Sequence, residues 1–258
     1  MKHIKRIAIT NEKGGVGKTM TAVNLSAILS ERGYKTLLID ADPQSSASAN
    51  FDLYHCPSPT LADVLKGTSL CTEAIRSTRF GVDVLPSSAD LTEFDLTLAS
   101  RKKNHDSYVS VFSDHLAPLK DYDFIIIDCP PSLSMLTINA MTTADTVLVP
   151  IQCEYYALEG LSQLIHTVNL VRERLNPTLD IEGIVFTMYD ARTNLSMQVV
   201  ENVKDHLNQK VYKTMIPRNI RLAEAPSYGM PINLYDAKSA GAESYMALAD
   251  EVIKRKGI

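Results

Sequence analysis

Residues 10–19 of the chain read Thr-Asn-Glu-Lys-Gly-Gly-Val-Gly-Lys-Thr, and this stretch decides the fold. It follows a short apolar run at residues 7–9 and leads into an apolar helical pattern at residues 19–32. A strand, a glycine-rich turn and a helix in this order form the context of a phosphate-binding loop. Glycines let backbone N–H groups approach phosphate oxygens, and the helix N-terminus adds partial positive charge. The loop therefore predicts a nucleotide site, in which Lys18 reaches the β- and γ-phosphates and the Thr19 hydroxyl ligates Mg²⁺.

The loop departs from the usual phosphate-loop pattern at its start. That pattern requires a glycine at position 12, where this chain has Glu12, and Lys13 supplies a second lysine instead. A lysine in a loop is usually a solvated surface residue. Because Lys13 stands beside a complete glycine–lysine–threonine string, a role at the nucleotide is the favoured interpretation. The residues of the loop that we expect to contact the nucleotide are Lys13, Gly14, Gly15, Val16, Gly17, Lys18, Thr19 and Met20.

Composition limits the class of protein. A chain of 258 residues that is 45% hydrophobic can bury a substantial core, and we expect one domain over residues 1–258 rather than two small ones. The net charge of -4 argues against a uniformly basic nucleic-acid binder, so any DNA contact would need a local patch. The four cysteines form no CxxC pair and the six histidines are scattered, so neither a zinc site nor a disulfide framework is indicated. With no signal-peptide pattern and only strand-sized apolar runs, we expect a cytoplasmic protein.

Short apolar runs alternate with longer helical patterns along the rest of the chain. Such a sequence predicts an α/β fold, a doubly wound and mostly parallel sheet flanked by helices, with its sites at the carboxyl ends of the strands. Residues 57–121 are the least strand-like and are expected to be a helical elaboration of the same domain. The further strands are expected at residues 36–39, 82–85, 124–127, 146–149 and 183–186, and the clearest helices at 158–175 and 197–207.

Three aspartates follow predicted strands. Asp42 lies at the end of the second strand, where a carboxylate could orient or activate the water that attacks the γ-phosphate. The alternative for Asp42 is a turn residue before Pro43. Asp128 ends another apolar strand, where it could hold the metal or a metal-bound water, or could satisfy loop N–H groups. Asp40 is the most ambiguous of the three and could be structural.

The loop with its extra lysine resembles the deviant Walker A motif of the ParA/MinD family of P-loop ATPases. Residues 40–44 and 124–132 resemble the second acidic motif and the Walker B motif of that family. Residues 150–160, 190–195 and 216–227 are especially similar to the chromosomal Soj branch. The resemblance covers essentially the whole chain. One departure follows Gln44, where Soj relatives usually continue with Gly-Asn-Ala and this chain has Ser45-Ser46-Ala47.

The resemblance implies an ATPase that binds ATP or ADP with Mg²⁺. In the family the extra lysine, here Lys13, reaches across a homodimer to the nucleotide of the partner. Glu154 is implied at the nucleotide or at the dimer interface, although a helix-start acid is the simpler interpretation. The implied catalytic residues are Lys13, Lys18 and Asp42. The implied metal-site residues are Thr19, Asp42 and Asp128, and the implied residues near the adenine base are Pro217, Arg218 and Asn219.

The Soj branch also implies partitioning of a chromosome or plasmid. Arg192 and Arg221 match positions of a non-specific DNA patch on the ATP dimer, which phosphate contacts would hold without sequence preference. A ParB-like (Spo0J-like) centromere-binding protein would stimulate hydrolysis and release the dimer, which in its ATP state would associate with the nucleoid. The neighbouring basic residues that could widen the patch are Lys204, Lys210, Lys213 and Arg218.

Two other functions share the deviant loop. A MinD-like ATPase that positions the division site or a cargo would need a C-terminal amphipathic helix for the membrane, but residues 248–258 fit docking onto the domain better, so no membrane partner is expected. An iron–sulfur ATPase would need placed cysteine ligands, and neither Cys129 nor Cys153 stands in such a context. Because the first strand begins within a few residues of Met1, no N-terminal helix-turn-helix domain is expected.

Overall fold

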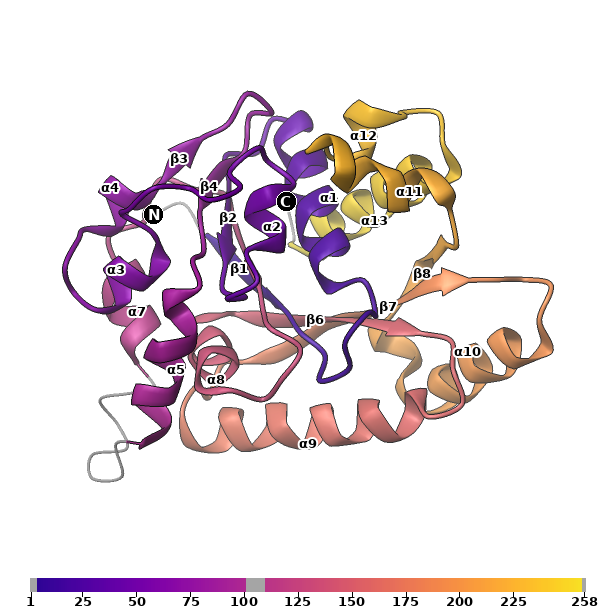
Figure 1. Cartoon of the computed structure of the whole chain (residues 1–258). Helices are drawn as coiled ribbons and strands as arrows, with labels where there is room; N and C mark the ends of the chain where they lie inside the picture. The colour runs from indigo at the N-terminus through magenta and orange to yellow at the C-terminus, as the bar shows by residue number, and fades with distance from the viewer. Residues whose placement is uncertain (1–3, 101–109, 257–258) are drawn as a thin grey trace.

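The computed structural model describes residues 4–100 and 110–256 and is built on one eight-stranded sheet (Figure 1). The strand order is β3-β4-β2-β5-β1-β6-β7-β8. Every neighbouring pair is parallel except β3 and β4. This confirms the predicted doubly wound, mostly parallel sheet. The strands are β1 (Lys5–Ile9), β2 (Thr36–Asp40), β3 (Arg76–Ser77), β4 (Asp83–Leu85), β5 (Phe124–Asp128), β6 (Thr146–Gln152), β7 (Asp180–Tyr189) and β8 (Val211–Pro217).

Helices cover both faces of the sheet, and each face buries its own apolar cluster. Successive strand residues point to opposite faces, so Ile7 and Ile9 enter one cluster and Ala8 the other. One cluster takes in α1 and α13, and Figure 1 shows these helices on the same side of the sheet, opposite α8 and α9. The helices are α1 (Lys18–Glu31), α2 (Ser46–Ala49), α3 (Leu61–Leu65), α4 (Cys71–Ala74), α5 (Asp90–Ser100), α7 (Val111–Leu116), α8 (Met135–Thr143), α9 (Ala157–Arg174), α10 (Asn194–Leu207), α11 (Ile220–Glu224), α12 (Ile232–Tyr235) and α13 (Ala240–Arg255), with 3₁₀ turns at η1 (Asn208–Lys210) and η2 (Ala225–Tyr228).

The sequence-based expectation missed two strands. β8 pairs with β7 at the edge of the sheet and ends at Pro217, so Pro217 belongs to a strand that the sequence did not reveal. Its residues mix buried Val211 and Tyr212 with exposed Lys213, a pattern that edge strands share with loops. β3 is only two residues long and lies, together with β4, in the stretch 57–121 that was expected to be a helical elaboration. Within residues 4–100 and 110–256, no helix is both long and apolar enough to cross a membrane.

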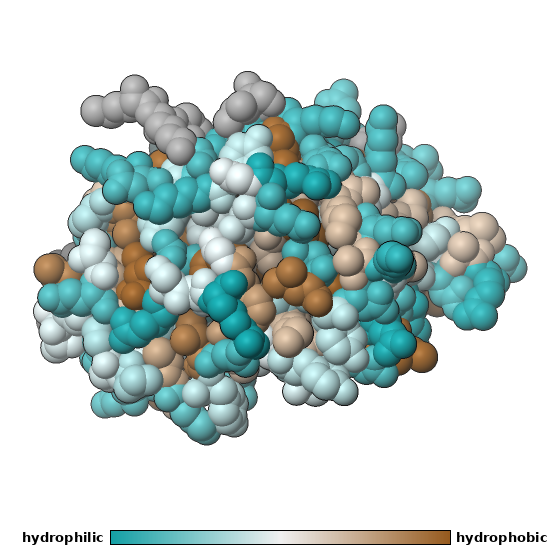
Figure 2. Space-filling view, turned by 90° about the horizontal axis from the view of Figure 1, so that it is seen from above, coloured by the Kyte–Doolittle hydropathy of each residue, from teal (hydrophilic) through white to brown (hydrophobic). Residues whose placement is uncertain are grey.

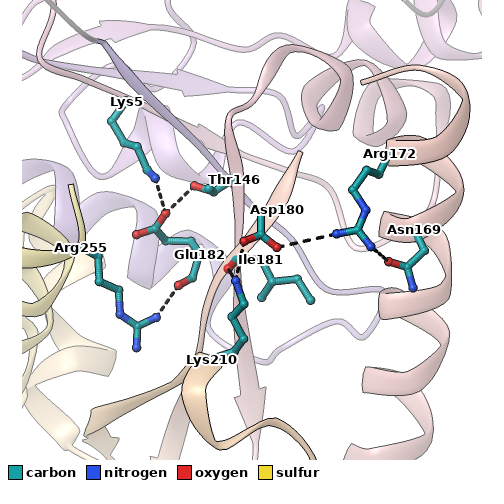
Figure 3. Close-up of polar contacts among 9 residues, drawn as sticks. All are labelled: Lys5, Thr146, Asn169, Arg172, Asp180, Ile181, Glu182, Lys210 and Arg255. Carbon is teal, nitrogen blue, oxygen red and sulfur yellow. Dashed lines mark hydrogen bonds and ion pairs between the residues drawn. The ribbon is translucent and has the colours of Figure 1, made fainter. Parts of the chain in front are cut away.

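A register shift in the β6–β7 pair leaves Glu182 as an extra residue between Ile181 and Gly183. The Glu182 side chain is 2% exposed and accepts contacts at 2.7 Å from both the Lys5 ammonium and the Thr146 hydroxyl (Figure 3). Arg255 at the end of α13 donates to the Glu182 carbonyl. The shift therefore builds a buried ionic contact that joins β1, β6, β7 and the last helix.

Ser45 adopts a left-handed backbone conformation, with φ at 57°, immediately before α2. Its side chain makes no capping hydrogen bond, so nothing local offsets the crowding of its Cβ. Ser45→Gly is expected to raise the free energy of unfolding by about 0.5–1 kcal/mol, after the greater entropy of glycine in the unfolded chain is subtracted. Urea unfolding measures the change. Ser46→Gly is the control, because Ser46 is helical and glycine there should destabilise the protein. Equal effects of both changes would contradict the conclusion that the backbone of Ser45 is strained.

Candidate nucleotide site

The glycine-rich loop joins β1 to α1 at the carboxyl edge of the sheet. Gly15 and Gly17 have φ of 76° and 88°, a region that side-chain-bearing residues rarely occupy. Gly17 is the N-cap of α1, and Lys18 is the first residue of that helix. The local sequence thus folds as expected, with a helix N-terminus directly behind a loop whose backbone can turn sharply.

Residues outside the loop hold its backbone in place. The Asn11 amide donates to the carbonyl of Pro150 at 2.8 Å, and its own oxygen accepts the N–H of Lys13 at 3.0 Å. The Thr187 hydroxyl donates to the carbonyl of Val16 at 2.7 Å. The loop is therefore tied to the ends of both β6 and β7.

Lys18 is buried at this point, with 6% of its surface exposed. Burial lowers the pKa of its ammonium, and the nearby charges of Asp128, Cys129 and Asp42 partly oppose that shift. Its Nζ donates to the carbonyl of Lys13 at 2.9 Å, and no salt bridge of Lys18 occurs among the residues described. A cation that is desolvated and lacks a direct carboxylate partner is suited to bind an anion such as phosphate.

Asp40 and Asp128 lie side by side, because β2 and β5 pair in register at these two residues. Asp40 accepts the N–H and the hydroxyl of Ser48, at 2.7 and 2.6 Å, and the N–H of Asp42 at 3.2 Å. Burial raises the pKa of Asp40 to about 6, against the lowering effect of the Ser48 hydrogen bonds. Asp40 therefore organises the turn after β2, as the structural interpretation of this residue requires.

Asp128 is buried, and neither of its carboxylate oxygens meets a hydrogen-bond partner of normal geometry in the described part of the chain. Burial raises its pKa well above the usual value, and the charge of Asp40 adds to the shift. The Thr19 hydroxyl is close enough to lower the pKa in part, without forming a bond of normal length and angle. An unpaired buried carboxylate beside a hydroxyl suits Mg²⁺, which needs few protein ligands when phosphates and waters supply the rest. Residues 4–100 and 110–256 contain no group of three or more His, Cys, Asp or Glu side chains able to hold a metal ion.

Asp42 is 9% exposed and lies in the turn that Asp40 organises. One of its carboxylate oxygens accepts the N–H of Gln44 at 2.9 Å, and its carbonyl accepts the Ser87 hydroxyl at 2.6 Å. Asp42 thus does act as a turn residue before Pro43. Because only one carboxylate oxygen serves the turn, the second is available to orient a water, and the geometry is compatible with both the turn role and the catalytic role.

A pocket of about 420 Å³ opens beside the loop. It brings Gly17 and Met20 together with Pro217, Arg218 and Asn219, which are some 200 positions away in the chain. The Asn219 side chain accepts the N–H of Leu222 at 3.2 Å and so caps α11. The other lining residues were not among those expected from the sequence, and they come from β7, β8, α11 and α13. They are Thr187, Met188, Ile216, Leu222, Ala223 and Tyr245.

Lys13 and Glu154 form a salt bridge within the chain, with 50% and 41% of their side chains exposed. The two residues that the resemblance places near the nucleotide are therefore brought together. Tyr155 and Tyr156 follow Glu154, are 77% and 70% exposed, and stack edge to face on each other. This corner of the molecule thus presents apolar rings beside a half-exposed ion pair.

The two arginines of the expected DNA patch are exposed but already paired. Arg192 contacts Asp190 at 2.7 Å, and its own side chain is 89% exposed. Arg221 contacts Glu224 at 2.8 Å and Asp236 at 3.3 Å. A phosphate that binds either arginine would have to compete with these carboxylates for the guanidinium group.

Lys210, which was expected to widen the patch, lies elsewhere. It contacts Asp180 at 2.5 Å, and Asp180 is the first residue of β7 (Figure 3). Arg192 follows the other end of this ten-residue strand, about 30 Å away at ~3.3 Å per residue. Lys210 therefore lies far from Arg192, at the opposite end of β7.

Cys129 and Cys153 behave as core residues. Cys129 and Cys153 are 1% and 8% exposed. Burial raises the pKa of both thiols, to about 11 for Cys153, which disfavours the thiolate form that binds iron–sulfur clusters.

Comparison with known proteins identifies the family to which the chain is related. A family model described as "AAA domain" matches residues 4–181. The chain is 50% identical over 254 residues to the sporulation initiation inhibitor protein Soj of Bacillus subtilis, covering 96% of this chain and 98% of that protein. It is 48% identical over 252 residues to the chromosome partitioning protein ParA of Myxococcus xanthus, covering 96% and 88%.

Solved structures agree with this placement. The ADP- and magnesium-bound cobyrinic acid a,c-diamide synthase of Mycobacterium smegmatis superposes with a TM-score of 0.84 at 34% identity, covering 99% of this chain and 96% of that one. The Mg-ADP complex of the septum site-determining protein MinD of Pyrococcus horikoshii gives a TM-score of 0.80 at 27% identity, covering 99% and 98%. With the fold, the loop and the sequence relatives in agreement, the chain belongs to the ParA/Soj family of P-loop ATPases.

Proposed function

We propose that this protein binds ATP with Mg²⁺, closes into a homodimer, binds DNA without sequence preference and releases it after ATP hydrolysis stimulated by a ParB-like partner. One observation carries the nucleotide part of the proposal. Buried Lys18, unpaired Asp128 and the pocket that contains Asn219 meet around a single glycine loop. The ADP and magnesium bound in the structure of the Mycobacterium smegmatis protein add support to the nucleotide part, and the name of the Myxococcus xanthus relative, a chromosome partitioning protein, supports a role in DNA partitioning.

The residues have distinct tasks in this proposal. The loop N–H groups and Lys18 bind the phosphates, and the pocket lined by Asn219 and Met20 holds the base. Thr19 and Asp128 are suited to hold Mg²⁺, which would neutralise charge on the phosphates when bound. Asp42 orients the attacking water through the carboxylate oxygen that Gln44 does not use.

The corner at Lys13 supports a homodimer. Lys13 is half-exposed, so its ammonium can leave Glu154 and contact a facing subunit at little cost in desolvation. The exposed rings of Tyr155 and Tyr156 are apolar surface that a second copy would cover.

Lys13→Ala is expected to retain nucleotide but to raise, by at least about tenfold, the protein concentration needed for the ATP dimer, because one charge-assisted contact per subunit is lost. Sedimentation with a non-hydrolysable ATP analogue measures this. Lys120→Ala, at an exposed lysine outside the site, is the matched control. A normal dimer of the Lys13 variant would remove Lys13 from the interface.

DNA binding is expected to require ATP and to weaken steeply with salt, because a dimer carries two copies of Arg192 and of Arg221. Arg221→Ala should lower affinity for every sequence and reduce the slope of log affinity against log salt by about two, since each dimer loses two phosphate contacts. Mobility shifts with ATP and with ADP at two salt concentrations test this.

The ion pair of Arg192 supplies a matched control for the same experiment. Asp190→Asn removes the carboxylate that competes with phosphate, so this variant should bind DNA more tightly than the wild type. Equal DNA binding in both nucleotide states, or no effect of either change, would contradict the patch.

The MinD-like alternative receives less support. Two of the three basic residues at the end of α13, Arg255 and Lys256, contact the carbonyls of Val211 and Asp123 at 3.3 and 2.8 Å, and the third, Lys254, is exposed. The Lys256 ammonium also lies 4.3 Å from the centre of the Phe124 ring. Both are held on the domain instead of facing lipid headgroups. The face seen in Figure 2 carries hydrophobic residues in small separate groups within a hydrophilic surface, so it offers no continuous apolar patch.

A further inference from the structure

The end of β7 contains an irregularity beside the nucleotide pocket. Phe186 pairs with Met215 and Tyr189 with Pro217, so two residues of β7 stand opposite one residue of β8. This is a β-bulge, formed by Thr187 and Met188. Met188 has φ of 49°, a strained conformation for a residue with a side chain. Strain of this kind persists where the surroundings enforce it and is concentrated at functional sites.

The bulge places Thr187 directly against the glycine loop. Its hydroxyl donates to the carbonyl of Val16 at 2.7 Å, although the two residues are 171 positions apart. Thr187 and Val16 are each 2% exposed, so water has little access to replace this bond. The methyl group of Thr187 packs at ordinary contact distance, 3.5 Å, from where a side chain on Gly17 would begin.

The bond orients one peptide group of the loop. In a trans peptide the C=O and the following N–H point in opposite directions. With the Val16 carbonyl turned toward β7, the N–H of Gly17 is turned away from β7. From this geometry we infer that Thr187 is a positioning residue for nucleotide binding, holding the Val16–Gly17 peptide so that its N–H serves the phosphates. The inference rests on the proposed function, because it assigns the role of Thr187 toward the same nucleotide.

Two substitutions separate the hydroxyl of Thr187 from its methyl group. Thr187→Val keeps the shape and removes the donor, and Thr187→Ser keeps the donor and removes the methyl. We expect Thr187→Val to weaken binding of a fluorescent ADP analogue about tenfold, which corresponds to about 1.4 kcal/mol, and Thr187→Ser to stay within about twofold of the wild type. Thr146→Val is the control, because the Thr146 hydroxyl also makes a buried 2.7 Å bond from a strand, to Glu182 at the opposite edge of the sheet. It should lower stability and leave nucleotide affinity unchanged.

The outcomes are distinguishable. Titration of each folded variant, with thermal unfolding measured in parallel, separates affinity from stability. Equal affinity of Thr187→Val and the wild type, or equal weakening by Val and Ser, would overturn the positioning role. Failure of the wild type itself to bind nucleotide would overturn the proposed function and the inference with it. If Thr187→Val does not fold, Thr187→Ala replaces it against the same serine variant.

Discussion

Asp42→Ala is expected to slow ATP hydrolysis at least about a hundredfold while nucleotide affinity stays within about twofold. The carboxylate lies at the end of β2, 9% exposed, near buried Lys18 and Asp128. Removing it takes away the group that positions the attacking water but leaves the phosphate loop intact. The variant should therefore persist in the ATP state. Single-turnover phosphate release measures the rate, and a fluorescent nucleotide measures the affinity.

Asp42→Asn separates the two roles of this residue. An asparagine oxygen can still accept the N–H of Gln44, so the turn is kept while the charge is lost. If Asp42 acts on the water, the asparagine variant should be nearly as slow as the alanine variant. Wild-type hydrolysis in Asp42→Asn would mean that Asp42 is a turn residue only.

Glu182→Ala is expected to lower the free energy of unfolding by about 3–5 kcal/mol, because removing one partner of a buried ion pair leaves the other charge uncompensated. Glu182 is 2% exposed in its side chain, and its partner Lys5 is 14% exposed. The Thr146 hydroxyl would lose its acceptor in the same change. Denaturant unfolding of the wild type and the variant measures the difference.

Two further variants test the cause of this effect. Arg32→Ala breaks the exposed ion pair with Asp250, whose side chains are 41% and 48% exposed, and should cost less than about 1 kcal/mol. The double change Lys5→Met with Glu182→Leu replaces the buried pair by apolar groups and should recover much of the loss. A loss below about 1 kcal/mol for Glu182→Ala would show that the pair contributes little to stability.

The local sequence was sufficient to predict those elements whose signal lies in neighbouring residues. Gly15, Gly17 and Lys18 take the turn, the cap and the first helical position that their order predicts. The buried strands β2 and β5 were recognisable because a fully buried parallel strand is a continuous apolar run. Edge strand β8 was missed because it mixes buried and exposed residues without strict alternation, as surface loops do.

The structure also changed the interpretation of particular charged residues. Asp40 and Asp42 are two positions apart and could not be ranked by pattern, yet three hydrogen bonds commit Asp40 to the turn. Lys210 seemed close to Arg192 along the chain, and the length of β7 puts it at the other end of the sheet. Closeness in sequence is a poor guide to closeness in space when a long helix, here α10, runs between two residues.

By itself the sequence determined the class of this protein, its phosphate loop and the three aspartates at the strand ends. These depend on backbone freedom, helix polarity and hydrophobic periodicity, which act between residues close together in the chain. Only the tertiary structure decided that Asn219 and Met20 share a pocket, that Glu154 pairs with Lys13, and that Thr187 holds the loop. Each of these contacts joins segments more than a hundred positions apart. Their geometry is set by strand order and by a bulge in β7, and neither has a local sequence signal.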